Sequence, residues 1–280
     1  MAATAQPLID YLHQLERKGE THVHLDSEAR VILRQFYINA LSPKQREIAQ
    51  PTTPKTSAAS VPTKTNATIN VTGNSPAEKI ASLKANAQEW QPAKALGTLR
   101  DTMVFSVGNP NADILLIGEA PGYEEEQKQE PFVGPAGKKL DGILKAMGLT
   151  RNDVYISNIV KFRPSMPNQT TGNRKPSAEE IATFMGFVKE EIKIIQPKVI
   201  IALGATAAQA LLENDSSVAS LRETFHQVNG TPLRVTYHPS YLLNNEANSE
   251  KRKVWEDMLA VMEQLSMPIS DKQRGFFTKG

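Results

Sequence analysis

Three polar side chains that could do chemistry each follow an apolar run typical of a buried strand. Glu119 comes after the run at residues 114–117, Asn158 after VYIS, and His238 after LRVTY. Ligands of open α/β sheets bind at the carboxyl ends of the strands, and a glycine there, such as Gly118, lets the backbone approach them closely. A carboxylate, an imidazole and an amide with a donor beside an acceptor are thus predicted at a ligand-binding edge.

Strands and helices alternate through the part of the chain that holds these residues. The apolar runs predict strands near 103–107 and at 114–117, 154–159, 199–203 and 233–237. The helical patterns predict helices at 75–90, 137–147, 177–195, 205–212 and 248–265. Alternation at this spacing predicts an α/β fold, a three-layer α/β/α sandwich around a central, mostly parallel sheet of four to five strands.

The composition allows a folded core and excludes several kinds of site. The chain has 280 residues, 40% of them hydrophobic, which suits one sizeable domain with appendages or two small domains. The absence of cysteine excludes disulfides, thiolate catalysis and metal or iron–sulfur sites with cysteine ligands. Basic and acidic residues number 32 and 30, so a nucleic-acid surface would have to be a local patch. Asp10, Glu16 and Glu20 interrupt the amino-terminal segment, and no apolar stretch approaches about 18 residues, so we expect a soluble, cytoplasmic protein.

Four regions follow one another along the chain. Residues 1–48 carry apolar residues at helix spacing and are predicted to form a helical module, which either binds a protein partner or docks on the main domain. Residues 49–76 are rich in Thr, Pro, Ser and Asn with little to bury, and are predicted to be a disordered linker. The main domain is expected at 77–267, followed by a polar tail at 268–280 whose two phenylalanines are either loose or docked.

Four motifs occur in order within the main domain. They are GEAPG at 118–122, PFVGPAG at 131–137, SNIVKFRP at 157–164 with NRKP at 173–176, and HPSYLL at 238–243. Together they resemble the uracil-DNA glycosylase superfamily, and within it the branch called family 4, over roughly residues 100–265. The resemblance implies a DNA glycosylase of base excision repair, which flips uracil out of DNA and hydrolyses its N-glycosidic bond.

The resemblance gives the strand-end residues roles in a uracil pocket. It implies that Phe132 stacks on the base, with Gly118 beside it. It implies that Asn158 reads the O4 and N3 edge, where cytosine presents the reversed pattern. His238 would donate to O2 as the leaving uracil gains charge, and Glu119 would orient the attacking water or stabilise the sugar cation. Each residue also has an ordinary explanation, as a core phenylalanine, an asparagine that caps a turn, or a surface histidine.

The resemblance also implies contacts with the DNA. The basic candidates for a phosphate track are Lys138, Lys161, Arg163 and Arg174. Ser240 and Leu242 have family counterparts that press on the backbone and on the gap left by the flipped base, although Leu243 would serve as well. Most lysines and arginines are solvated surface charges, so their positions in the sequence do not by themselves assign these roles.

The chain departs from family 4 at the ligands of its iron–sulfur cluster. Enzymes of that branch hold the cluster on four cysteines, and the positions that match are near Gln91, Lys94, Phe162 and Phe184. We therefore expect no cofactor and no metal. We expect Phe162 and Phe184 to fill the cluster volume, and full burial of each would contribute about 1.5–3 kcal/mol. A second departure is Ala120, where the classical branch of the superfamily carries an aspartate.

The sequence thus predicts a monofunctional uracil-DNA glycosylase, an N-glycosyl hydrolase that acts as a monomer on single- or double-stranded DNA, with no membrane partner. A related branch of the superfamily carries an insertion here with a histidine that traps the sugar covalently. The loop at 165–172 has no histidine, so the resemblance implies hydrolysis and not a covalent end point. Two alternatives stay open. One is a DNA-binding or scaffold protein that keeps the fold without turnover. The other is a glycosylase with a preference for deaminated purines, which the pocket width near Tyr123, Glu125 and Glu126 would decide.

Overall fold

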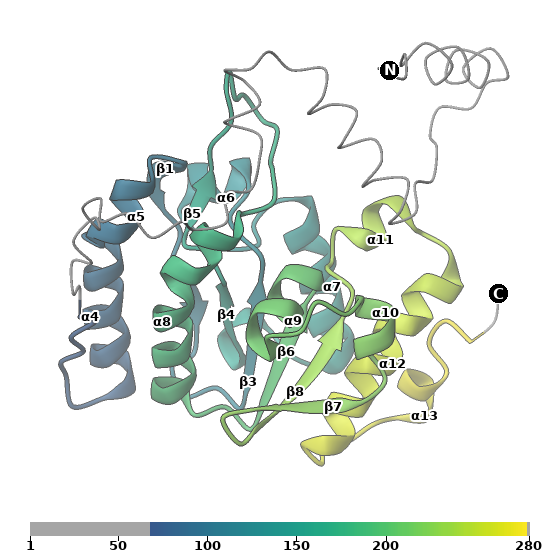
Figure 1. The fold of residues 1–280 in the computed structure, drawn as a ribbon. Coiled ribbons are helices and arrows are strands. Elements are labelled where there is room, and N and C mark those ends of the chain that lie inside the picture. Colours follow the sequence, from purple (N-terminus) through teal and green to yellow (C-terminus); the bar gives the residue numbers. More distant parts are fainter. Residues whose placement is uncertain (1–67, 279–280) are drawn as a thin grey trace, which may run out of the picture. The chain divides into compact units, whose positions relative to one another are not determined.

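The structure, a computed structural model, describes residues 68–278 (Figure 1). The described residues all belong to one compact unit, Thr65–Gly280. The predicted helical module at 1–48 lies outside them, as does most of the predicted linker at 49–76, so both stay predictions. Among the residues that the structure describes, no helix is long and apolar enough to cross a membrane.

A six-stranded sheet forms the centre of this unit, with the strand order β2-β4-β3-β6-β8-β7. Its strands are β2 (Ser106–Gly108), β3 (Ile114–Gly118), β4 (Tyr155–Asn158), β6 (Val199–Leu203), β7 (Phe225–Val228) and β8 (Thr231–Thr236). β4, β3, β6 and β8 run parallel, and β2 and β7 pair antiparallel at the two edges. The predicted α/β class with a mostly parallel sheet is confirmed. The short edge strand β7, which the sequence did not predict, contributes the sixth strand.

The strand predicted near 103–107 divides into two. β1 (Leu99–Met103) pairs antiparallel with β5 (Phe162–Pro164) in a separate two-stranded sheet, while β2 joins the central sheet. Val104 lies between β1 and β2, and its backbone N–H donates to the Lys161 carbonyl at 2.8 Å. The segment before the central sheet is therefore tied to the turn that follows β4.

Helices cover both faces of the central sheet (Figure 1). The alternation of side chains along β3 distinguishes the faces, because Leu115 and Ile117 belong to one apolar core and Ile114 and Leu116 to the other. One face carries α4 (Pro76–Gln88), α5 (Gln91–Leu96), α8 (Ala178–Ile195) and α9 (Ala205–Leu212). The other carries α7 (Pro135–Met147) and α12 (Asn248–Gln264). Short helices complete the unit: α6 (Tyr123–Lys128), α10 (Val218–Leu221), α11 (Tyr241–Asn244), α13 (Asp271–Arg274) and the 3-10 turn η1 (Arg151–Asp153).

Local signals in the sequence set the ends of the long helices. Ser75 and Glu78 form a capping box at the start of α4, in which the Ser75 hydroxyl accepts from the Glu78 backbone N–H at 3.2 Å. Ser177 and Glu180 form the same arrangement at the start of α8. α7 ends at Gly148, whose φ of +84° is the left-handed conformation that glycine adopts without strain. The helices therefore begin and end where the capping residues lie.

Both ends of the described segment pack against the unit. Ile69 and Val71, which the sequence assigned to the linker, pack against the core that contains α8. Near the carboxyl end, the rings of Phe276 and Trp255 lie 5.3 Å apart between centroids. Phe276 is therefore docked on α12, whereas Phe277 is 40% exposed.

Candidate active site

A cavity of about 360 Å³ opens at the carboxyl edge of the parallel strands. Each parallel strand contributes a residue to its wall: Glu119 after β3, Asn158 at the end of β4, Gly204 after β6 and His238 after β8. Phe132, from the loop before α7, also lines it. The fold thus brings together the carboxylate, the amide, the imidazole and the phenyl ring that the sequence singled out.

Phe132 is held beside His238 in an unusual backbone conformation. The two rings lie 5.6 Å apart between centroids, at an interplanar angle of 33°. Phe132 has a φ of +56°, which is an outlier for a bulky residue. Arg151 binds this backbone, donating to the carbonyls of Pro131, at 3.0 Å, and of Phe132. A Cβ atom at Gly137 would lie 1.7 Å from the Phe132 carbonyl oxygen, so the start of α7 admits only glycine there.

Asn158 lies beside Gly118 in the sheet, because β3 and β4 pair with these two residues in register. A Cβ atom at Gly118 would lie 2.4 Å from both the Asn158 Oδ1 atom and the Phe132 Cζ atom. Only glycine therefore lets the amide and the ring approach each other here. In the part of the chain that the structure describes, the Asn158 side-chain amide has no hydrogen-bond partner. Its donor and its acceptor are available to a ligand.

His238 contributes a neutral imidazole to the cavity wall. Its Nδ1 atom accepts from the Ser240 backbone N–H at 3.2 Å and from the Ser240 hydroxyl at 2.7 Å. Because Nδ1 is the acceptor, the neutral ring carries its proton on Nε2, which becomes a donor. Burial lowers the pKa of His238 to about 4, although Glu125 raises it, so the ring is uncharged at neutral pH. Ser240, for which the sequence suggested a contact with DNA, here orients the imidazole.

Two carboxylates at the cavity have partners that the sequence did not indicate. The Glu119 carboxylate accepts from the hydroxyl of Thr206, in the first turn of α9. Glu125, which the sequence considered only for the width of the pocket, accepts from the backbone N–H groups of Val133 and Gly134 at 3.0 and 2.9 Å. It thereby ties α6 to the loop before α7. The one signal for Thr206 was its position just after a predicted strand end.

Two of the basic residues predicted to meet DNA lie where solvent reaches them. Lys138 is exposed in the first turn of α7. Arg174 lines the cavity, but its guanidinium donates to the Glu180 carboxylate at 2.6 and 2.8 Å. Burial raises the pKa of Glu180, yet Arg174 and neighbouring donors bring it down to about 2, so the pair is ionised at neutral pH. Lys175 is exposed at the cavity, with no ion-pair partner among residues 68–278.

Lys161 and Arg163 are buried, which corrects the prediction that they contact phosphates. Lys161 is fully buried, and its ammonium lies 2.5 Å from the Glu191 carboxylate. Arg163 is 2% exposed and donates to Glu126 at 2.8 Å and to Asn173 at 2.9 Å. Both side chains are directed inward because carboxylates from α8 and α6 neutralise them there.

Leu242 is also buried, and this changes the assignment within HPSYLL. It is 6% exposed and packs among residues of α7 and α12. Its neighbour Leu243 is 37% exposed. Because α11 is a single helical turn, adjacent side chains point to different sides of it. Of the two leucines of HPSYLL, only Leu243 therefore presents its side chain to solvent.

Aromatic side chains stand at two of the four positions that match the cysteine ligands of family 4, and a cavity lined by Lys94 and Phe162, at two of these positions, remains beside them. Phe162 and Phe184, at two of the four matched positions, are buried with their ring centroids 5.8 Å apart. Phe184 lies 6.1 Å from Phe187, which meets Trp90 edge-on at 5.0 Å. We call these four residues the aromatic cluster. The chain has no cysteine and no sulfur ligand at the matched positions, so an iron–sulfur cluster does not fit here.

Comparison with known proteins matches this chain to uracil-DNA glycosylases of types 4 and 5. A family model described as the uracil DNA glycosylase superfamily matches residues 105–259. A type-4 uracil-DNA glycosylase of Thermotoga maritima is 42% identical over 161 residues, which cover 57% of this chain and 81% of that protein. A type-4 uracil-DNA glycosylase of Archaeoglobus fulgidus is 37% identical over 166 residues, 55% of this chain and 80% of that protein. A type-5 uracil-DNA glycosylase of Pyrobaculum aerophilum is 28% identical over 152 residues, 48% of this chain and 64% of that protein.

Proposed function

The chain belongs to the uracil DNA glycosylase superfamily, and from that membership we propose that it excises uracil from DNA. The base would be flipped out of the stack, bound in the cavity at the strand ends, and released by hydrolysis of its N-glycosidic bond. The observation that carries this proposal is the side-chain amide of Asn158, which has no partner among residues 68–278 and faces the same cavity as the rings of Phe132 and His238.

Recognition of uracil follows from the hydrogen-bonding groups of that amide. Uracil presents an acceptor at O4 beside a donor at N3, which complements the Nδ2 donor and the Oδ1 acceptor of Asn158. Cytosine presents a donor and an acceptor in the opposite order. The Phe132 ring supplies a flat apolar surface on which the base would stack. Asn158 would therefore favour uracil over cytosine by hydrogen bonding, and Phe132 would bind the flat face of the base by stacking.

Bond cleavage would place negative charge on the base and positive charge on the sugar. As the bond between C1′ and N1 breaks, its electron pair stays with uracil, and the Nε2–H of His238 would donate to O2 as that oxygen gains charge. The sugar becomes an oxocarbenium-like cation, which the Glu119 carboxylate would stabilise while it orients the attacking water. The water oxygen bonds to C1′ and would lose a proton to the Glu119 carboxylate, which passes it to solvent, while the departing uracil anion takes up a proton from solvent at N1. The products are free uracil and an abasic site.

The test is excision from a labelled oligonucleotide that contains one uracil, with hypoxanthine and thymine in its place as controls. We expect alkali-sensitive cleavage at uracil only. Asn158→Ala and His238→Ala would each lower the rate by about 100-fold or more. His226→Ala is the matched control, because His226 lies on the edge strand β7 and does not line the cavity.

The outcomes distinguish the proposal from its rivals. Cleavage at hypoxanthine in preference to uracil would indicate a glycosylase for deaminated purines. Bound DNA with no product from any base would overturn the catalytic proposal and indicate a protein that keeps the fold for DNA binding alone.

A further inference from the structure

The Lys161 side chain is fully buried, and all three N–H donors of its ammonium form hydrogen bonds. One of the acceptors belongs to Asn158, which lines the cavity. The ammonium donates to the Asn158 backbone carbonyl at 2.8 Å, to the Ser157 hydroxyl at 2.7 Å and to the Glu191 carboxylate at 2.5 Å. Burial lowers the pKa of Lys161, and Glu191 opposes that shift. One of the three bonds thus reaches the backbone of the residue that would read the base.

Apart from its hydrogen-bond partners, the Lys161 ammonium meets the Phe105 ring, whose centre lies 5.0 Å away, and an otherwise apolar surrounding. The two preceding residues, Ile159 and Val160, are fully buried and apolar. Buried ion pairs are seldom more stabilising than apolar side chains of similar volume, because both charges must leave water. A fold selected only for stability would therefore accept an uncharged side chain here. The bond to the Asn158 carbonyl is something that an apolar side chain could not make.

Backbone bonds hold the turn after β4, and the Asn158 carbonyl is bonded in addition by a side chain. The N–H groups of Ile159 and Val160 donate to the carbonyls of Gly118 and Glu119 at 2.9 and 3.1 Å. β4 ends at Asn158, so its peptide lies at the point where the strand gives way to the turn. The Asn158 carbonyl and the Ile159 N–H belong to one peptide plane, so the Gly118 carbonyl holds one edge of that plane and the Lys161 ammonium holds the other.

Glu191 fixes the other end of the contact. Its carboxylate accepts from the Ser157 hydroxyl at 2.9 Å and from the Tyr155 hydroxyl at 3.3 Å, and it lies on α8. Phe184 and Phe187 of the aromatic cluster precede it on the same helix at spacings of seven and four residues, which share one face. The packing of the aromatic cluster therefore holds Glu191 beneath the turn.

We propose that Lys161 and Glu191 are a pair of positioning residues that hold Asn158 in the orientation required to bind uracil. The proposal rests on the proposed function. Neither residue lines the cavity, so neither touches the base. They act on the base only through the Asn158 peptide. We therefore expect them to affect the rate of cleavage of the bound base.

The test uses the double variant Lys161→Met/Glu191→Gln, which removes both charges, keeps the approximate volumes and retains an acceptor for Ser157 and Tyr155. The matched control is Lys189→Met/Glu213→Gln, the same two exchanges at an ion pair whose side chains are 56% and 83% exposed. We expect the double variant to melt cooperatively and to keep its affinity for DNA that carries a tetrahydrofuran abasic-site analogue. We expect kcat for uracil excision to fall by about 10- to 100-fold while KM changes by less than about threefold. The control variant would match the wild-type protein in every measurement.

Combination with Asn158→Ala separates positioning from general damage. If the pair acts through Asn158, adding Lys161→Met/Glu191→Gln to Asn158→Ala produces no further loss of kcat. Losses that multiply, or an unchanged kcat in the double variant, would overturn the proposal.

The positioning proposal can also be tested if the protein does not release uracil. A wild-type protein that releases no uracil would refute the glycosylase proposal. The Asn158 side-chain amide resonances would then be compared between the wild-type and double-variant proteins by ¹⁵N NMR. A shift or broadening confined to that region supports positioning, and unchanged resonances would refute it.

Discussion

Two clusters of buried charge lie on opposite faces of the central sheet, each against a strand that leads into the cavity. The Lys161 cluster joins the end of β4 to α8 and consists of Tyr155, Ser157, Lys161 and Glu191. The Asp257 cluster joins the end of β8 to α12 and consists of Arg222, Arg234, Thr236 and Asp257. β4 ends at Asn158 and β8 leads to His238, so each cluster supports one residue of the proposed base site.

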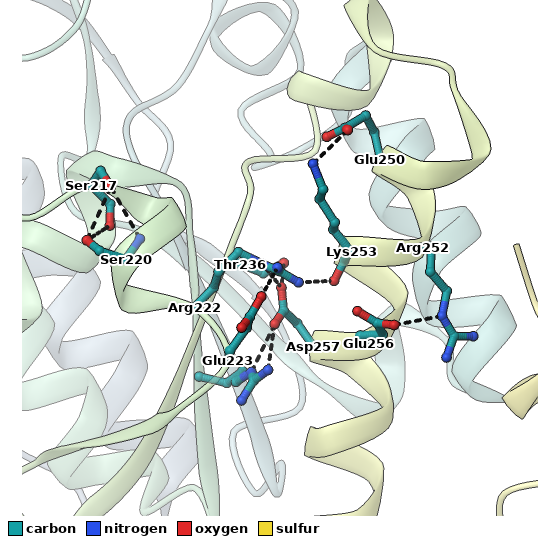
Figure 2. Close-up of polar contacts among 11 residues, drawn as sticks. Ser217, Ser220, Arg222, Glu223, Thr236, Glu250, Arg252, Lys253, Glu256 and Asp257 are labelled. Carbon is teal, nitrogen blue, oxygen red and sulfur yellow. Dashed lines mark hydrogen bonds and ion pairs between the residues drawn. The ribbon is translucent and has the colours of Figure 1, made fainter. Parts of the chain in front are cut away.

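The Asp257 cluster forms no bond with the residue that it supports. Figure 2 shows Arg222, Thr236 and Asp257 converging between β8 and α12. The Asp257 carboxylate accepts from Arg222 at 3.1 Å, from Arg234 at 2.7 Å and from Thr236 at 2.8 Å. Thr236 lies two residues before His238, and it is the residue nearest to His238 in the sequence that bonds to Asp257.

Aromatic packing makes the remaining connection. The Arg222 guanidinium lies 5.6 Å from the centre of the Tyr237 ring, which stacks on Tyr241 with centroids 4.5 Å apart and an interplanar angle of 15°. Packing of this kind fixes the course of a segment, whereas a hydrogen bond to a peptide carbonyl orients that one peptide. We therefore expect the Asp257 cluster to govern the stability of the unit and the Lys161 cluster to govern the geometry of the site.

Substitution of Asp257 tests whether the two clusters have different roles. Asp257→Asn removes the carboxylate shared by two buried guanidinium groups, of which only Arg222 keeps another, Glu223 at 2.8 Å. We therefore expect the free energy of unfolding to fall by about 3–5 kcal/mol, measured by urea denaturation. Glu256→Gln, at an exposed ion pair with Arg252 on the same helix, would change it by no more than about 1 kcal/mol. Uracil excision by the folded Asp257→Asn protein would stay within about threefold of wild type. A much larger loss of excision with unchanged stability would show that this cluster also positions the site.

The aromatic cluster offers a second test, because it holds the helix that carries Glu191. Phe184→Ala opens a cavity in a fully buried position, so we expect a loss of about 3–5 kcal/mol in thermal or urea unfolding. Phe277→Ala, at a ring that is 40% exposed, is the control and would have a small effect. Under conditions where both proteins are folded, Phe184→Ala would excise uracil more slowly than Asp257→Asn. Equal rates would indicate that α8 does not transmit its position to the β4–β5 turn.

The pH dependence of folding tests whether burial lowers the pKa of His238. The imidazole has a pKa of about 4 in the folded protein, below the 6.5 of an unperturbed histidine, because it is buried. The unfolded chain therefore binds the proton first as the pH falls. The contribution of this group to stability is complete above about pH 6.5, and about 3 kcal/mol of it is lost on approach to pH 4.

The measurement is urea unfolding at a series of pH values. His238→Asn would lack this part of the pH dependence, and His226→Ala would retain it. Parallel curves for wild type and His238→Asn would mean that the imidazole titrates normally and is not held neutral by burial.

The elements of the fold were predictable where local signals were strong. The alternation of apolar runs and capped helices predicted the layers, and the parallel strands match the predicted ranges to within two residues at each end. The edge strand β7 was missed because its residues, FHQV, are half polar and carry no buried pattern. The division of the predicted strand at 103–107 depends on the pairing of β1 with β5, a contact between distant segments that local periodicity does not encode.

The sequence predicted the residues that line the site, but it did not predict the residues that position them. The motifs identified the side chains that line the cavity, because strand ends are a general location for ligands. They could not tell an exposed lysine from a buried one, since the partner of Lys161 is Glu191, thirty positions away on another element. Ser240 and Thr206 were misread or missed for the same reason: their bonds to His238 and Glu119 exist only once the loops are folded.

The smallest expected effect separates two adjacent leucines on α11, the helix that follows the strand held by the Asp257 cluster. Leu243→Ala would change the free energy of unfolding by less than about 0.5 kcal/mol, because the side chain is 37% exposed. Leu242→Ala removes a buried side chain and would lower it by about 2–5 kcal/mol. If the exposed leucine fills the space left by a flipped base, Leu243→Ala would slow excision from duplex DNA and leave excision from single strands unchanged, since a single strand has no paired stack to hold open. Excision by the two variants from duplex and single-stranded DNA therefore shows which leucine fills the space left by the flipped base. A duplex-specific defect in folded Leu242→Ala, with none in Leu243→Ala, would assign that role to the buried leucine. It would also imply that α11 rearranges on DNA.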